Sequence, residues 1–229
     1  MARGANADAI AVGEEVRLAD ETGGPAKWLL HVPAEVSRTN WYGRLAALAA
    51  FTLWTLWIWH EVDIPAGESG SRFLHLVLTP FHEAGHYLIF RWFGQFIFIL
   101  GGTLGQHLLP IVIGGVMIVQ KRNPFGAALA LWLLGYSLID MGVYMYDAFD
   151  PKLGLIGGGT GAESDSHDWQ NLFGDMELLR RARGIGMFWG WVGYATMTAG
   201  LLWGAWMLWL QKAHLSESPF AEEEIREPR

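Results

Sequence analysis

The residues His82, Glu83 and His86 have the types and the spacing of a metal site that could carry out hydrolysis. On an α-helix four residues advance about 400°, so the two imidazoles point the same way and can share one zinc ion. Glu83 is offset from both, which puts its carboxylate beside the metal and not on it. There it can take a proton from a zinc-activated water. The motif therefore predicts a zinc site with Glu83 as the general base.

The surroundings of this motif are apolar, because it lies within a hydrophobic stretch from Phe73 to Phe93. In a soluble protein the same pattern more often marks a surface helix that carries two histidines. Burying three ionisable side chains in hydrocarbon is costly unless something binds them, so a chance match is rare in such a segment. The setting therefore favours a bound metal. Thr79-Pro80 upstream either begins the ligand helix or kinks an existing one.

A catalytic zinc site needs a third protein ligand. His167 is the residue that we favour, with Asp168 next to it orienting an imidazole by a hydrogen bond. Asp140 is an alternative, because an acid in the middle of an apolar segment is a functional candidate by default. Tyr144 and Asp147 follow Asp140 at spacings of four and seven, so the three share one helix face. Beside His167, four residues stay open as ligands or as partners of a ligand: Asp140, Tyr144, Asp147 and Asp168.

The loop that contains His167 also has a simpler explanation. The glycines at 157–159 are typical of a flexible linker, and the polar segment after them predicts a capped amphipathic helix. Asp165 would be its N-cap and Asp168 its third residue. That explanation accounts for both acids without a metal, but it does not account for His167.

Composition and hydropathy predict an integral membrane protein. Hydrophobic residues make up 52% of the 229 residues, and the charges gather at the ends and in a few loops. We therefore expect an all-α polytopic fold with about five transmembrane or re-entrant helical segments, in contact with membrane lipid. The apolar segments are Trp41–Trp59, Phe73–Phe93, Gly94–Gln120, Pro124–Tyr146 and Gly184–Leu210.

The chain divides into three parts by composition. Residues 1–40 form a polar cytoplasmic arm, and 41–211 form a transmembrane helical domain with a glycine-rich loop at 150–183. We expect residues 212–229 to form an acidic, disordered tail. The net charge of −7 argues against nucleic acid as a partner, and without cysteine no thiolate can act as ligand or nucleophile.

Lys and Arg residues indicate the orientation, with one disagreement. Most basic residues near the segment ends agree with a cytoplasmic N-terminus and five crossings, whereas Lys121 and Arg122 would lie outside in that arrangement. The third segment could re-enter instead of crossing, because Gly101, Gly102 and Pro110 are poor helix formers.

The segment from Phe73 to Leu179 resembles the site-two protease family of intramembrane zinc metallopeptidases, through the motif at 82–86 and the intramembrane Asp140. The resemblance implies two histidine ligands, a downstream Asp ligand, a Glu base and a transmembrane substrate. In this chain Met141-Gly142, and not a glycine pair, follows Asp140. The whole pattern, including 167–172, is more similar to a group of small uncharacterised bacterial membrane proteins with the same motif, which implies the bacterial inner membrane.

The leading interpretation is a membrane-embedded zinc metalloprotease that cleaves a membrane-protein or peptide substrate. A second one is a non-catalytic metal-binding subunit of a larger membrane complex or a homo-oligomer, in which zinc ties helices together. In a third, His82, His86 and His107 ligate haem or a pigment.

Overall fold

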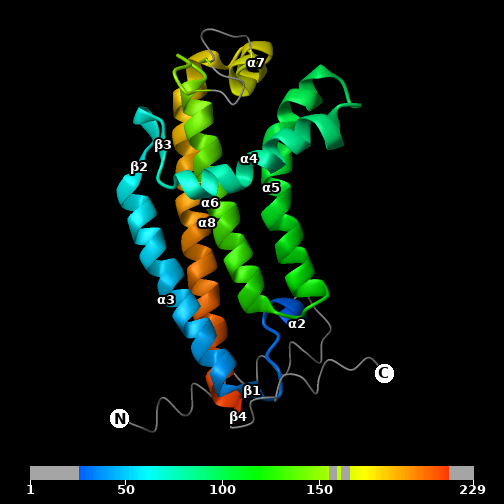
Figure 1. Cartoon of the computed structure of the whole chain (residues 1–229), viewed down its shortest axis with the longest axis vertical. Coiled ribbons are helices and arrows are strands. Elements are labelled where there is room, and N and C mark those ends of the chain that lie inside the picture. Colours follow the sequence, from blue (N-terminus) through cyan, green and yellow to red (C-terminus); the bar gives the residue numbers. More distant parts are fainter. Residues whose placement is uncertain (1–25, 155–158, 161–165, 217–229) are drawn as a thin grey trace. The chain divides into compact units, whose positions relative to one another are not determined.

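The computed structural model describes residues 26–154, 159–160 and 166–216. Most of the predicted arm, part of the glycine-rich loop, Asp165 and the tail from 217 lie outside the described residues. The described chain is mostly helical, which confirms the all-α prediction (Figure 1). The main helices are α2 (Ala26–Leu29), α3 (Arg38–Glu61), α4 (Arg72–Ala84), α5 (Gln95–Val119), α6 (Pro124–Asp147), α7 (Asp168–Asp175) and α8 (Ala182–Gln211).

Short elements connect these helices. Three are 3-10 turns, η1 (Ile64–Ala66), η3 (Leu179–Arg181) and η4 (Lys212–His214), and one is a π-helical turn, η2 (Gly85–Phe90). Strand β1 (Val36–Ser37) pairs in parallel with β4 (Leu215–Ser216). Strand β2 (Val62–Asp63) pairs antiparallel with β3 (Glu68–Ser69).

Three of the five predicted apolar segments lie within single long helices, α3, α6 and α8, and a fourth, Gly94–Gln120, extends one residue beyond α5 at each end. Two of these, α5 and α6, are long and apolar enough to cross a membrane by length and composition, with mean hydropathies of 1.8 and 1.5. The remaining segment, 73–93, is not one helix, because it divides into α4 and the π-helical turn η2.

The ligand helix α4 begins before the proline. Ser71 is its N-cap, and the Ser71 hydroxyl accepts a hydrogen bond from the Leu74 amide at 3.3 Å. Pro80 lies inside the helix. The prediction that the helix could begin at Thr79-Pro80 was therefore wrong, and the alternative of a proline within an existing helix is what the structure has.

Helix α5 is unbroken from Gln95 to Val119, so the structure does not have the alternative of a third segment broken at its glycines and proline. The glycines instead allow close packing. A Cβ at Gly105 would overlap the Phe81 carbonyl oxygen of α4, and one at Gly101 would overlap the Phe90 side chain of η2. Contacts of this kind outweigh the low helix propensity of glycine.

The chain forms two compact units. The first contains 1–52, 113–130 and 200–229, with a core of Phe125, Met207, Leu208 and Leu210. Within it the Trp41 indole donates to the Leu208 carbonyl oxygen at 2.9 Å.

The second unit contains 53–112 and 131–199, and it holds every candidate site residue. Its core includes Ile99 of α5, Met141 and Met145 of α6, and Trp169 and Leu172 of α7. Helices α6 and α8 pack through glycines, since a Cβ at Gly142 would meet the backbone of Gly186 at 2.7 Å. In Figure 1, α4 lies across the direction of α6 and α8, and α7 lies beside their ends.

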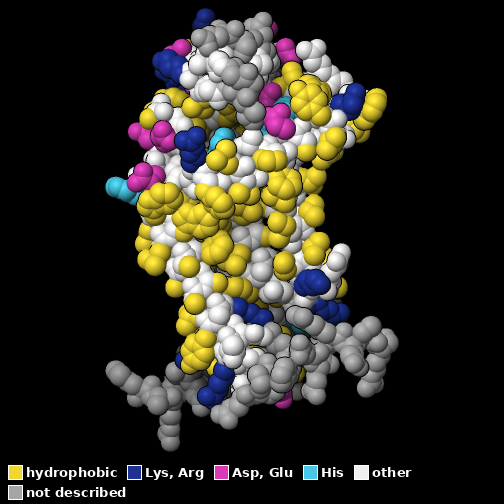
Figure 2. Space-filling view, in the orientation of Figure 1, with side chains coloured by type: hydrophobic (Ala, Val, Ile, Leu, Met, Phe, Trp, Pro, Cys, Tyr) yellow, Lys and Arg dark blue, Asp and Glu magenta, His cyan; other side chains and the backbone are white. Residues whose placement is uncertain are grey.

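Large hydrophobic side chains remain exposed on α4. Phe73 is 64% exposed and Leu76 is 58% exposed. Figure 2 shows hydrophobic side chains gathered at the level of α4, while charged side chains of this unit gather toward α7. This helix therefore has an apolar outer face that the second unit does not cover.

Candidate metal centre

His82, His86 and Asp168 form a compact group of three potential metal ligands. Asp168 Oδ2 lies 2.9 Å from His82 Nε2 and 3.1 Å from His86 Nε2, and the two Nε2 atoms are 3.2 Å apart. Ligand atoms at 2.0–2.1 Å from a tetrahedral zinc are separated by about 3.3 Å. The three atoms therefore have nearly the separations that three ligands of one zinc ion require.

The hydrogen bonds of His86 require a cation, either a proton or a metal ion, at its Nε2 atom. Its Nδ1 lies 2.7 Å from the Phe98 carbonyl oxygen, which can only accept, so Nδ1 carries a proton. In the neutral ring Nε2 then has only a lone pair, and it faces a carboxylate oxygen that also only accepts. A proton or a metal ion must lie between them. A carbonyl on the far ring nitrogen is also the usual partner of a metal-binding histidine.

The Asp168 carboxyl is in the form that binds metals. Burial raises its pKa, but hydrogen bonds with His82 and His86 outweigh burial and hold the pKa below its usual range. The side chain is therefore ionised at neutral pH, although it is only 14% exposed.

Gly102 of α5 leaves space next to both imidazoles. A Cβ at this position would meet the Nε2 atoms of His86 and His82. A glycine here keeps open the place that an ion between the ligands would use. Sequence reasoning treated Gly102 only as a helix breaker, and its close approach to the imidazoles of His82 and His86 is visible only in the folded chain.

Glu83 lies beside this group in a large cavity. The cavity has a volume of about 1100 Å³, and its lining includes His82, Glu83, His86 and Asp168. Glu83 is partly buried. The predicted base and the ligand group thus face the same space, as the spacing of the motif predicts.

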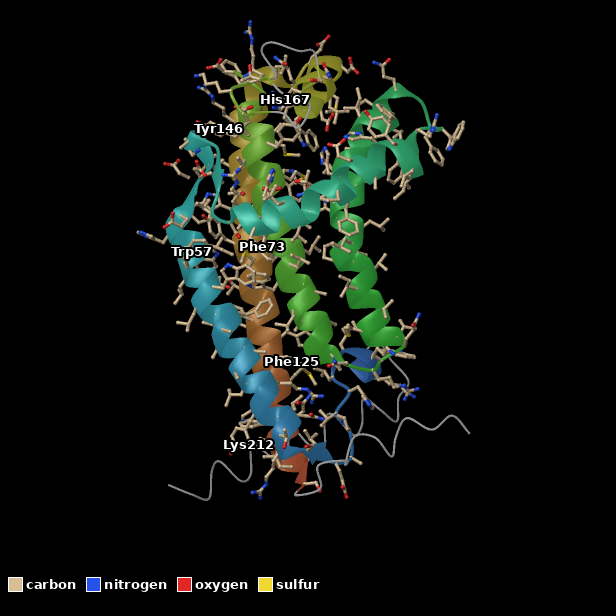
Figure 3. The ribbon with its side chains drawn as sticks, in the orientation of Figure 1. Trp57, Phe73, Phe125, Tyr146, His167 and Lys212 are labelled. Carbon is tan, nitrogen blue, oxygen red and sulfur yellow. The ribbon has the colours of Figure 1, made fainter. Side chains whose placement is uncertain are left out.

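His167 has a different position from the one that we expected. Its Nδ1 accepts from the Gln170 amide at 3.1 Å, which makes it the N-cap of α7. Its Nε2 donates to Asp147 Oδ2 at 3.3 Å. Both ring nitrogens are therefore engaged, and Asp168 lies at the third corner of the ligand triangle. The helix begins at Asp168, and its N-cap is His167 instead of the predicted Asp165. Figure 3 labels the position of His167.

Two α6 residues hold the segment that carries Asp168. The Asp147 carboxylate accepts from His167 and from the amides of Lys152 and Leu153, at 2.9–3.3 Å. The Tyr144 hydroxyl accepts from the Asp168 amide at 3.2 Å. Tyr144 and Asp147 thus contact the neighbours and the backbone of Asp168, and they lie outside the ligand group.

Asp140 belongs to a second polar cluster in the same cavity. Its Oδ1 lies 2.9 Å from His75 Nδ1, and its Oδ2 accepts from the Gln106 amide at 3.0 Å. The structure does not bring Asp140 into the group of His82, His86 and Asp168. Sequence reasoning did not assign His75 to the site, and the signal for it was its position seven residues before His82 on the same helix face.

No family model matches the chain, and it matches neither a curated protein nor a solved structure.

Proposed function

We propose that this protein is an integral membrane zinc metallopeptidase in which His82, His86 and Asp168 bind the metal and Glu83 is the general base. The observation that carries the proposal is the triangle of Nε2, Nε2 and Oδ2 atoms with sides of 2.9–3.2 Å. It lies on a cavity that Glu83 also lines.

Three protein ligands are typical of a catalytic zinc, whereas structural zinc sites usually have four. The group contains three ligand residues among the described parts of the chain. This count supports the catalytic interpretation over a metal that only ties helices together. Zinc in such a site supplies a Lewis acid and activates water for attack.

The chain's own residues have separate roles in the proposed reaction. Glu83 accepts the proton of the attacking water and then returns it to the leaving amine. Phe98 fixes the ring of His86 through its carbonyl oxygen, and Tyr144 fixes the backbone of Asp168. The cavity, at about 1100 Å³, is slightly larger than most small-molecule pockets and suits an extended peptide segment.

The membrane location is part of this proposal. The length and apolar character of α5 and α6 support it. The resemblance to site-two proteases implies Asp140 as the Asp ligand, but the grouping of His82, His86 and Asp168 supports Asp168 in that role instead. The bacterial inner membrane is the location that the sequence resemblance implies.

Metal analysis together with a cleavage assay tests the proposal. We expect the protein purified in detergent to contain one zinc per chain, and His82→Ala and Asp168→Ala to lose it. Wild type with zinc should cleave peptides in a mixture of random sequences, as read by mass spectrometry. Stoichiometric zinc without any cleavage would contradict the peptidase assignment, and an absence of transition metal would contradict the whole proposal.

A further inference from the structure

Helix α4 has two faces of opposite character. Phe73, Leu76 and Phe81 are exposed on one face, at 64%, 58% and 40%. His75 and His82 lie on the opposite face and line the cavity. An exposed apolar face opposite a polar one is typical of helices that lie in a membrane interface.

Contacts with α5 show that α4 crosses that helix. His75 and Gln106 both bind the Asp140 carboxylate, so His75 lies at the level of Gln106. Six residues further along α4, Phe81 contacts Gly105, the residue next to Gln106. Between the level of His75 and Gln106 and the contact of Phe81 with Gly105, the chain advances about 9 Å along α4 but only about 1.5 Å along α5. The two helices therefore cross. Figure 1 shows the same crosswise direction.

The polar surface of the second unit begins near the start of α4, at Ser69 and Ser71. The Tyr136 hydroxyl of α6 donates to the Ser71 carbonyl oxygen at 2.6 Å and lies 3.0 Å from Ser69 Oγ. The segment around these serines carries exposed charged side chains at Glu61, Asp63, Glu68 and Arg72. Charged residues at the end of α3 and the start of α4 mark a boundary with water at that level.

The first unit supplies an independent argument. It contains the start of α3 and the turn between α5 and α6, and Arg122 of that turn stacks on Trp28. If α3, the segment 73–93 and α5 all crossed the membrane, the start of α3 and the α5–α6 turn would lie on opposite sides. If only α3 and α5 cross, the start of α3 and this turn lie on the same side. The described basic residues of this unit are Lys27, Arg38, Arg44, Lys121, Arg122 and Lys212, against one acid, Glu35. That excess fits a cytoplasmic side and removes the disagreement over Lys121 and Arg122.

We infer that α4 lies parallel to the membrane surface, with Phe73, Leu76 and Phe81 against lipid acyl chains and with the His82 face turned to a water-accessible cavity. Lipid is the occupant because the exposed apolar surface of the same unit continues on α5, a candidate membrane span, at Leu108, Ile111 and Val112. The inference rests on the proposed membrane location. It gives the proposed peptidase an interfacial site instead of one enclosed in a transmembrane helix.

Spin labels on single cysteines test this orientation, and the absence of native cysteine makes each label unique. Labels replace Phe73, Phe81, Thr79 and Ile111 in separate variants of the full chain, in vesicles of phosphatidylcholine and phosphatidylglycerol. Collision rates with oxygen and with a water-soluble nickel chelate report depth. We expect Phe73→Cys and Phe81→Cys to lie at the same depth in lipid, and Thr79→Cys to contact the nickel chelate. A crossing helix would separate the first two by about 12 Å.

The other outcomes contradict the membrane location, the orientation of α4 or its contact with lipid. If Ile111→Cys is in water, the membrane location itself is wrong. If it is in lipid while labels 73 and 81 differ by the full helical rise, α4 crosses the bilayer and the inference fails. Labels at 73 and 81 that are shielded from both reagents would show that a protein surface covers this face. Metal content equal to that of wild type confirms that each variant is folded.

Discussion

The Nε2 atom of His167 lies 3.3 Å from the Oδ2 atom of Asp147, and this pair joins the start of α7 to the end of α6. Asp168 follows His167 directly and supplies the third corner of the ligand triangle. His167 is fully buried. The position of Asp168, the proposed acidic ligand, therefore depends on a histidine that lies outside the group of His82, His86 and Asp168.

Weakening this pair should weaken metal binding without removing a ligand. In His167→Asn the shorter side chain can still cap α7, but it cannot reach Asp147 in the same way. Loss of a group that orients a ligand typically costs about 10–100-fold in metal affinity. Competition with a chelator of known zinc affinity measures the change. His60→Ala, at a side chain that is 83% exposed, is the matched control and should bind zinc like wild type. Complete loss of zinc in His167→Asn would instead favour His167 as a ligand.

Adding a methyl group at Gly102 should block the metal group from the side of α5. The Cβ of Gly102→Ala would meet the Nε2 atoms of both histidines, so we expect zinc content to fall strongly. Gly115→Ala is the control on the same helix, because nothing lies within 4 Å of a Cβ there. That change should leave zinc unaltered and add up to about 1 kcal/mol of helix stability. Normal zinc content in Gly102→Ala would show that the space beside Gly102 is not used by the ion.

Local patterns in the sequence were sufficient for the shared face of His82 and His86 and for most long helices, but not for the start of α4 or for the π-helical turn that contains His86. The spacing of His82 and His86 depends only on helix geometry, so it predicts a shared ligand face without any tertiary information. Apolar runs likewise predict α3, α5, α6 and α8, because each helix carries its own hydrophobic residues.

Tertiary contacts determine which residue joins His82 and His86 and which direction α4 takes, and local sequence patterns do not predict either. Choosing between His167 and Asp168 requires the rotation of the start of α7, which contacts with Asp147 and Tyr144 on α6 determine. The direction of α4 is equally non-local, since it depends on the approach of Phe81 and Gly85 to the glycines of α5. Hydropathy describes how apolar a segment is, and it does not describe where the segment points.

Glu83→Gln should separate metal binding from catalysis. The amide cannot accept the proton of the attacking water, so kcat should fall by about 10²–10⁴-fold. Zinc content should stay at the wild-type value, because Glu83 is not in the ligand group. Glu68→Gln is the control, since Glu68 lines the same cavity and is exposed. Cleavage by Glu83→Gln at the wild-type rate would show that another group is the base.

Asp140→Ala distinguishes a metal ligand from a group that ties helices together. The Asp140 carboxylate joins His75 of α4 to Gln106 of α5, and it lies outside the ligand triangle. Its loss leaves the buried Gln106 amide without this acceptor, so we expect unfolding to become easier by about 1–3 kcal/mol. Zinc per folded chain should be unchanged. The measurement combines thermal unfolding in detergent with metal analysis of the folded fraction. Zinc loss from protein that is still folded would make Asp140 a ligand, as the resemblance to site-two proteases implies, and would require a rearrangement of α4 relative to α6.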